Sequence, residues 1–171
     1  MKTRTITIYS FDELTERAKD KAIEKLFHTN VYFEWWEYIF EDAKKAGIEI
    51  TGFDIDRGNQ IKGNPIVPLT DSLKAILANH GEACETYKTA ISYKQTLDDL
   101  LAKDALLPED EQDSYDFEQS MDELREAFCK EILEDYLTML RHEFEYQTSR
   151  EAVEETIKAN NYDFDENGNL I

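Results

Sequence analysis

Carboxylate side chains dominate one stretch of the sequence, residues 109–134, where acidic residues follow one another at short intervals. On a helix, carboxylates three or four residues apart project about 5–6 Å from one another. This spacing is comparable with that of neighbouring phosphates on a nucleic-acid strand, so a rigid acidic helix can occupy a groove built for DNA or RNA. The candidate partner-binding residues are Glu109, Asp110, Glu111, Asp113, Asp116, Glu118, Asp122, Glu123, Glu126 and Glu134.

The charge is unevenly distributed along the chain. The whole sequence has 19 Lys and Arg, 38 Asp and Glu and a net charge of −19; residues 104–171 hold 5 and 21 of these and carry −16. Such a surface repels nucleic acid, anionic membranes and phosphate-rich ligands. We therefore expect a basic, nucleic-acid-binding protein as the partner, with no direct binding of nucleic acid or membranes. The alternative is that the charge is only a solvated face.

The histidines and cysteines do not form a metal-ligand pattern. His80 precedes Cys84 by four residues, but Gly81 between them should break the helix that would align them. We interpret Cys84 and Cys129 as reduced structural thiols on buried faces. The sequence also lacks a Gly-rich phosphate loop and a nucleophile elbow. We expect no metal, no cofactor and no catalytic residue.

One long helix, predicted from Ser114 to Tyr146, must position most of the carboxylates. Its apolar residues step by three or four, as one helical face requires, and should form the spine of the core. The preceding residues 107–114 contain a proline and an acidic run, which predict a loop or a disordered hinge. The apolar stripe consists of Phe117, Met121, Leu124, Phe128, Ile132, Tyr136, Leu140 and Phe144.

Two elements are predicted before residue 30. Alternating Thr and Ile indicate a strand from Lys2 to Tyr9. Ser10 and Glu13 then have the spacing of a capping box, so a helix should follow and run to about His28.

Aromatic residues are concentrated at the start of the next predicted helix, Val31–Ala46, which contains both tryptophans and ends at Gly47. We interpret them as a stripe that anchors the core, with a ligand-stacking platform as the alternative. The residues on this side are Tyr32, Trp35, Trp36, Ile39 and Phe40.

The middle of the chain predicts a sheet. A strand over residues 48–58, in which Gly52 marks a bulge or a close backbone contact, is followed by a return strand over residues 61–67. With the first strand, these make an antiparallel sheet of at least three strands.

Helical patterns complete the prediction at residues 69–79, at residues 82–102 and after Thr148 or Ser149, and Asn167-Gly168 indicates a hairpin over residues 162–171. We predict a single α+β domain over residues 1–171, with a small antiparallel sheet packed against several helices. No basic and apolar leader follows Met1, and no apolar run is long enough to span a membrane, so we expect a cytoplasmic protein.

A short motif resembles a known catalytic loop. Phe53-Asp54-Ile55-Asp56 is similar to the paired-aspartate loop of haloacid-dehalogenase-type phosphatases. The resemblance implies that Asp54 is a nucleophile and Asp56 a general acid beside magnesium, as in a small metal-dependent phosphoesterase. However, no alternation of strands and helices with a parallel sheet is apparent. We favour the interpretation that the two aspartates are solvent-facing residues of a strand.

Longer segments resemble a family of small uncharacterised phage and prophage proteins, some of them loosely labelled as antitoxin-like. The resemblance spans nearly the full length and implies the setting of a phage accessory protein, which commonly binds host machinery. The segments that carry it are Tyr9-Ser10-Phe11-Asp12-Glu13-Leu14, Tyr32-Phe33-Glu34-Trp35-Trp36, Gly52-Phe53-Asp54-Ile55-Asp56-Arg57-Gly58 and Ala159-Asn160-Asn161-Tyr162-Asp163-Phe164.

The setting and the charge together predict a non-enzymatic, acidic nucleic-acid mimic in the cytoplasm of a bacterial host. It would bind and inhibit a basic defence protein such as a CRISPR effector, a restriction enzyme or another nuclease. The alternative is an antitoxin or scaffold-type module that binds protein through the aromatic surface of residues 32–40. The sequence leaves the oligomeric state open, a dimer included.

Overall fold

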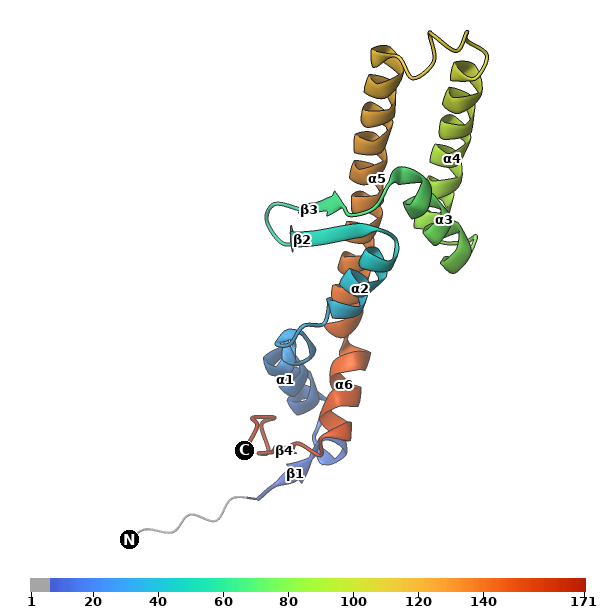
Figure 1. Ribbon diagram of the computed structural model, residues 1–171. Coiled ribbons are helices and arrows are strands. Elements are labelled where there is room, and N and C mark those ends of the chain that lie inside the picture. The colour runs from blue at the N-terminus through green and yellow to red at the C-terminus, as the bar shows by residue number, and fades with distance from the viewer. Residues whose placement is uncertain (1–6) are drawn as a thin grey trace. The chain divides into compact units, whose positions relative to one another are not determined.

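The long amphipathic segment folds as one helix, α5 (Tyr115–Gln147), in the computed structural model, which describes residues 7–171. The described residues form six α-helices and two small antiparallel sheets, which confirms the predicted α+β class (Figure 1). The chain divides into two compact units: unit 1 is Met1–Trp35 with His142–Ile171, and unit 2 is Trp36–Arg141. No helix within the described residues is both long and apolar enough to cross a lipid bilayer.

Unit 2 contains most of α5 and the second sheet. Its fully buried side chains come from every helix of the unit and from β2. In chain order, its elements are α2 (Glu37–Lys45), β2 (Ile48–Asp54), β3 (Gln60–Pro65), α3 (Leu69–Asn79), α4 (Glu85–Asp104) and the first part of α5. Its core includes Ile39, Ala43, Ile48, Ile76, Ala90, Ile132, Tyr136 and Leu137.

The β2–β3 hairpin follows α2 through a turn that requires glycine. Gly47 has φ +83°, and a Cβ atom at this position would lie 2.3 Å from Cγ2 of Val67. The two strands pair antiparallel, and their register shifts between Ile50 and Gly52. Of the two alternatives predicted for Gly52, this irregularity confirms the bulge.

Unit 1 is built from the two ends of the chain. Its small sheet pairs a strand from residues 9–10 with a strand from residues 163–164, and aromatic rings from both ends meet in its core. Its elements are β1 (Tyr9–Ser10), the 3₁₀ turn η1 (Phe11–Glu13), α1 (Glu16–Leu26), the 3₁₀ turn η2 (Thr29–Val31), α6 (Arg150–Ala159), β4 (Asp163–Phe164) and the last turns of α5. Its core consists of Phe11, Leu14, Ala18, Ala22, Ile23, Val153, Ile157 and Phe164.

The predicted three-stranded sheet is wrong. β1 pairs with β4, and β2 pairs with β3, so the described strands form two separate sheets. The partner of β1 comes from the opposite end of the chain, and local alternation carries no information about such a distant pairing. Most of the strand predicted at Lys2–Tyr9 lies outside the described residues.

The helix predicted at Val31–Ala46 is also wrong in its first part, because the α-helix begins only at Glu37. Trp35 packs against Phe144 within unit 1, with ring centroids 5.7 Å apart, whereas Trp36 packs against Phe53 within unit 2 at 5.6 Å. Neighbouring residues of an α-helix project only about 100° apart. The chain therefore leaves the helical path where two adjacent tryptophans enter different cores.

Two other helix starts differ from the prediction. The Ser10–Glu13 capping pair closes the short η1 turn, where Ser10 N–H and Oγ–H both donate to Glu13 Oε2 at 2.8 Å. The α1 helix then begins after a second cap, Thr15, and ends at Leu26. Helix α4 begins at Glu85 instead of residue 82, because the Cys84 N–H donates to the carbonyl of Gly81 and closes a turn before it.

Candidate functional site

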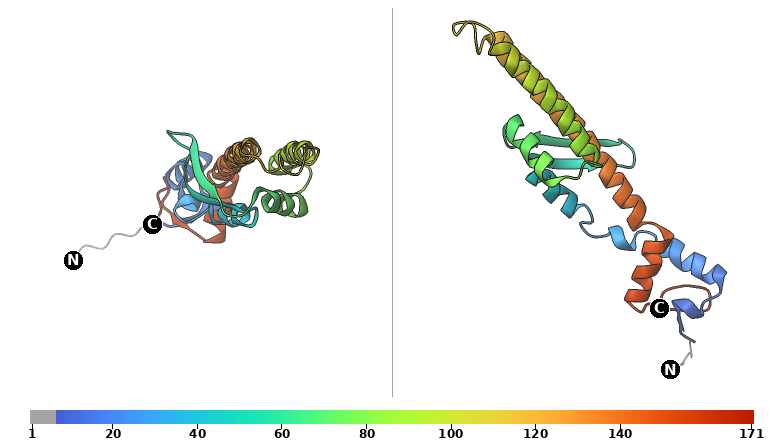
Figure 2. Two further views of the ribbon diagram at one scale, coloured as in Figure 1. Left: turned by 45° about the horizontal axis from the view of Figure 1, so that its top comes forward. Right: turned by 90° about the vertical axis from the view of Figure 1, so that its right-hand side faces the viewer.

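Helices α4 and α5 form an antiparallel hairpin within unit 2. Figure 1 and the left view of Figure 2 show the two helices side by side, joined by the loop after α4. At the base of the hairpin, the rings of Tyr93 and Phe128 lie 5.4 Å apart. The Thr89 hydroxyl donates to Asp135 Oδ2 at 2.8 Å, and the Tyr93 hydroxyl donates to Glu131 Oε2 at 2.9 Å. These contacts fix α4 on α5.

We call the outer part of this hairpin, residues 98–127, the arm. Leu97 and Phe128, which flank it, are buried, but no residue of the arm is buried. Its apolar side chains are at best half-buried, as in a pair of helices with no third layer over it. The half-buried ones are Leu100, Phe117, Met121 and Leu124, and the exposed ones are Leu101, Leu106, Leu107 and Tyr115.

The arm concentrates the acidic residues that the sequence singled out. It has 12 Asp and Glu residues against Lys103 and Arg125, a net charge of −10. All ten candidate partner-binding residues are exposed, nine of them on the arm and Glu134 beyond its base on the same helix. The structure therefore brings them together on one hairpin.

The candidate carboxylates form no ion pairs among the described residues. Only one ion pair reaches the arm, from Lys94 to Asp98 at its base. Because the charges are not compensated locally, their fields add over the whole arm.

The tip of the arm is an ordered turn. The Gln112 side chain donates to the Leu107 carbonyl at 2.8 Å, and the Asp113 N–H donates to Asp104 Oδ1 at 3.2 Å. Asp113 has φ +53°, a backbone conformation that aspartate tolerates better than most residues. The segment is thus the loop that the sequence predicted, closed by hydrogen bonds that hold its acidic residues next to α5.

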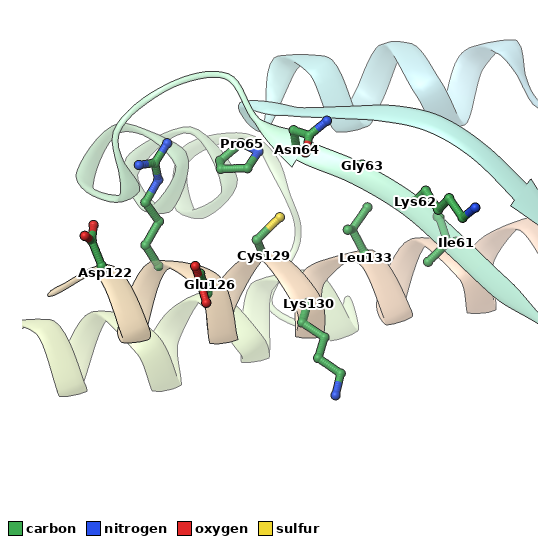
Figure 3. Close-up of a pocket in the computed structure, with 11 residues that line it drawn as sticks. Ile61, Lys62, Gly63, Asn64, Pro65, Asp122, Glu126, Cys129, Lys130 and Leu133 are labelled. Carbon is green, nitrogen blue, oxygen red and sulfur yellow. The ribbon is translucent and has the colours of Figure 1, made fainter. Parts of the chain in front are cut away.

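A groove of about 650 Å³ lies between β3 and α5, and two of the candidate residues, Asp122 and Glu126, line it (Figure 3). Gly63 allows the strand to approach the helix: a Cβ atom there would lie 2.8 Å from Cδ2 of Leu133 and 2.7 Å from the carbonyl oxygen of Glu49. The groove also contains the basic residues Lys62, Arg125 and Lys130. Sequence reasoning missed this groove, because it joins segments about sixty residues apart in the chain.

A partly buried polar network joins the other helices of unit 2 to α5. The fully buried Tyr136 hydroxyl donates to Asp42 Oδ2 at 3.0 Å, and burial raises the pKa of this tyrosine. The same oxygen lies 3.5 Å from Nε2 of His80, whose Nδ1 is 2.7 Å from the Thr86 hydroxyl. The network joins α2, the end of α3, α4 and α5, which gives His80 a structural position that the sequence did not reveal.

Asp54, the residue that resembles a phosphatase nucleophile, closes the β2–β3 turn. Its Oδ1 accepts hydrogen bonds from the N–H groups of Asp56 and Arg57, and its Oδ2 accepts one from Gly58, all at 3.0 Å. These bonds hold the pKa of the Asp54 carboxyl below its ordinary value. Asp56 is exposed beside it. A turn-forming role therefore accounts for Asp54.

The aromatic surface predicted at residues 32–40 is divided. Trp36 and Phe40 pack against Phe53 in unit 2, at ring distances of 5.6 and 5.9 Å. Tyr32 and Phe33 are instead 76% and 79% exposed. Part of the segment thus anchors the core of unit 2, as predicted, and three large aromatic side chains, Tyr32, Phe33 and Tyr38, remain on the surface.

Among residues 7–171, no group of three or more His, Cys, Asp or Glu side chains could hold a metal ion. Both cysteines are free thiols. Cys129 is buried, and its burial raises the pKa of the thiol. Cys84 is exposed at the start of α4. The expectation that both cysteines lie on buried faces is therefore wrong for Cys84, because the helix that would have buried it begins one residue later.

No protein-family model, curated protein or solved structure matches this chain. The similarity to phage proteins therefore stays a prediction from the sequence segments that carry it.

Proposed function

We propose that this protein is a non-enzymatic phage accessory protein that mimics nucleic acid. Its arm would bind and inhibit a basic, nucleic-acid-binding defence protein of the bacterial host, such as a CRISPR effector, a restriction enzyme or another nuclease. The observation that carries the proposal is the arm itself: 12 carboxylates on one hairpin, with a net charge of −10.

The arrangement of the charges supports mimicry better than charge alone. Glu118, Asp122 and Glu126 follow one another at intervals of four residues on α5, so they form a row with a repeat of about 6 Å. The helix holds this row in place, whereas a disordered acidic tail would have to be ordered on binding. A protein surface that binds successive phosphates meets a comparable series of fixed negative charges here.

A pull-down from host lysate tests the proposal. The bait is the full chain, compared with the charge-reversed arm variant Asp122→Lys/Glu126→Lys/Glu134→Lys. A matched control makes the same change of charge away from the arm, at Glu24, Glu41 and Glu155, which are exposed and in no ion pair within the described residues. We expect the wild type and the control, but not the arm variant, to retain a nucleic-acid-binding protein.

Salt and competition complete this experiment. Binding through uncompensated charges should weaken steeply as ionic strength rises, and added duplex DNA or tRNA should release the captured protein. A partner that the arm variant retains as well as the wild type does would refute the proposal.

The exposed Tyr32 and Phe33 favour a second candidate function, an antitoxin or scaffold-type module that binds protein through these aromatic side chains. The double variant Tyr32→Ser/Phe33→Ser separates the two candidates. If the aromatic pair binds the partner, this variant should fail to retain the partner, whereas high salt should not release it from the wild type. If the arm binds the partner, the variant should retain it and high salt should release it.

A further inference from the structure

The groove between β3 and α5 follows the edge of the strand. All five residues of Ile61–Pro65 line it. Successive residues of a strand point to opposite faces, so a groove lined by five in a row borders the backbone edge and not one face. A hollow of about 420 Å³, lined by residues 65–69 and Met121, extends it, because both spaces share Pro65 and Asp122.

No described strand pairs with this edge. Within residues 7–171, the sheet consists of β2 and β3 alone. The Ile66 N–H donates to the Gly47 carbonyl at 2.8 Å, which sets the phase of the antiparallel ladder. Hydrogen-bonded and non-hydrogen-bonded pairs alternate, so the N–H and C=O of Gly63 and the C=O of Pro65 face outward. Pro65 has no N–H group, so at this edge it leaves no backbone donor without a partner.

The groove has the length of a short extended peptide. A peptide that pairs with β3 runs along this strand, which has six residues, Gln60–Pro65. A strand advances about 3.3 Å per residue, so about five or six residues fill the groove.

The helix wall of the groove selects the side chains of such a peptide. In Figure 3, Cys129 and Leu133 point from α5 towards β3 and offer an apolar wall, whereas Lys130 points away. Asp122 and Glu126 line the same side of the groove and add two carboxylates to this wall. One apolar and two basic side chains at alternate positions therefore match this wall.

Charge determines which molecule supplies the segment. Three basic residues, Lys62, Arg125 and Lys130, line the groove beside its two carboxylates, so the acidic character comes from the adjoining arm, which has a net charge of −10 with Arg125 included. A second copy of this chain would bring a further −19, so like-charge repulsion disfavours it. A segment of a basic protein is complementary to this surface.

We propose that the outer edge of β3 binds an extended basic segment of the partner protein as a third strand, with its alternate side chains against α5. This inference rests on the proposed function for the basic character of the partner. It adds the mode by which one segment binds, through main-chain hydrogen bonds to β3 and pockets for alternate side chains.

The test uses the full chain and three synthetic seven-residue peptides. The first has valine at its second position, lysine at its fourth and sixth, and threonine elsewhere. The second peptide has the same composition, but its two lysines are adjacent. The third has the sequence of the first, and methyl groups replace the hydrogens of the alternate backbone N–H groups that would bond to β3. We expect the second and third peptides to bind at least about tenfold more weakly, because each lacks one part of the recognition.

Amide hydrogen exchange at Gly63, measured by NMR, reports on the edge directly. We expect rapid exchange in the free protein and at least tenfold slower exchange with saturating first peptide. A Gly63 amide that is already protected without peptide, or that the peptide leaves unchanged, would overturn the proposal.

A matched pair of variants locates the contact. Asp122→Asn/Glu126→Gln should weaken binding of the first peptide about tenfold. The control Asp99→Asn/Glu41→Gln should not, because these two exposed residues do not line the groove and are not among the candidate partner-binding residues. If all three peptides bind equally well, the third-strand inference fails and the proposed function stands. If none binds and the charge-reversed arm retains its partner, both fail.

Discussion

Unit 1 and the arm are both rich in carboxylates, but within residues 7–171 unit 1 pairs several of them, whereas the arm pairs Asp98 alone. In unit 1, Lys158 Nζ lies 3.2 Å from Asp12 and 2.8 Å from Glu154, and Arg150 lies 2.6 Å from Asp20. The arm has 12 acidic residues for two basic ones. Exposed pairs stabilise a fold only slightly, yet uncompensated charge destabilises it through self-repulsion.

The two regions also differ in packing. Unit 1 encloses side chains with no exposed surface, such as Phe164, Val153 and Ile157, whereas no residue of the arm is buried. The arm therefore combines repulsion with little burial and depends on the contacts at its base. A region that contributes so little to the core and carries so much charge is better explained by binding than by folding, which is the basis of the proposed function.

Truncating one phenylalanine in each region should give the largest contrast. Phe164 is fully buried, and its ring lies 6.1 Å from that of Phe11, so Phe164→Ala should cost about 3–5 kcal/mol. Phe117 is only half-buried on the arm, so Phe117→Ala should cost less than half as much. Urea unfolding followed by circular dichroism measures both. Equal losses would show that the arm has a core of its own.

Removing one hydroxyl tests how firmly α5 is held at the base of the arm. Tyr136→Phe deletes the hydrogen bond to Asp42 in the partly buried network of unit 2 and should cost about 1–2 kcal/mol, since the acceptor is a charged group that stays partly solvated. The same urea experiment measures the loss. Hydrogen exchange should then rise along α2 and α5 but not in unit 1, and an unchanged free energy would mean that the bond does not hold the elements together.

The helices of both regions could be predicted from the sequence because their signals are local. α3 has the predicted bounds, residues 69–79, and α5 begins and ends within one residue of its prediction. Heptad-like steps such as Phe117, Met121 and Leu124 lie within one helix and need no knowledge of the rest of the chain. The exposure of the acidic residues follows from the same periodicity.

Features that join distant segments could not be predicted. The pairing of β1 with β4 brings together residues about 150 positions apart, and the groove depends on the close approach of Gly63 to Leu133. The break before α2 likewise depends on which core each tryptophan enters. Periodicity reports that a residue is buried but not which partner buries it.

Two aspartates of unit 2 should respond to pH in opposite directions. Burial raises the pKa of the Asp135 carboxyl in the folded state, so its ionised form destabilises the fold, and this penalty is relieved as pH falls through the raised pKa. Asp54 has a lowered pKa because of its backbone hydrogen bonds. Its contribution is present above the unfolded pKa near 3.8 and is lost as pH falls through the lower folded value.

Asp135→Asn should therefore raise the free energy of unfolding at pH 7. The gain should be smaller than the loss caused by Tyr136→Phe, and it should vanish below about pH 4. Asparagine can still accept the bond from Thr89. Asp54→Asn should instead lower stability at pH 7 and have little effect in acid. Urea midpoints measured from pH 3 to pH 7 check both, and parallel pH profiles for the two variants would contradict the assignment.

The smallest expected effect comes from removing one carboxylate in each region, and the sign of the change in stability should differ between the arm and unit 1. Asp122 lies four residues from both Glu118 and Glu126, and each such like-charge pair costs about 0.2–0.5 kcal/mol. Asp122→Asn should therefore stabilise the arm by a few tenths of a kcal/mol at about 10 mM salt and by nothing measurable near 1 M, where charges are screened within about 3 Å.

The matched change in unit 1 is Glu154→Gln, which removes the carboxylate 2.8 Å from Lys158. It should destabilise by a similar amount at low salt, because it breaks an attractive pair instead of a repulsive one. Amide exchange along α5 and α6, measured at both salt concentrations, resolves shifts of this size in each helix separately. If both substitutions stabilised their helices, the charge of the arm would be no less compensated than that of unit 1, and the main reason for assigning the arm to a basic partner would be lost.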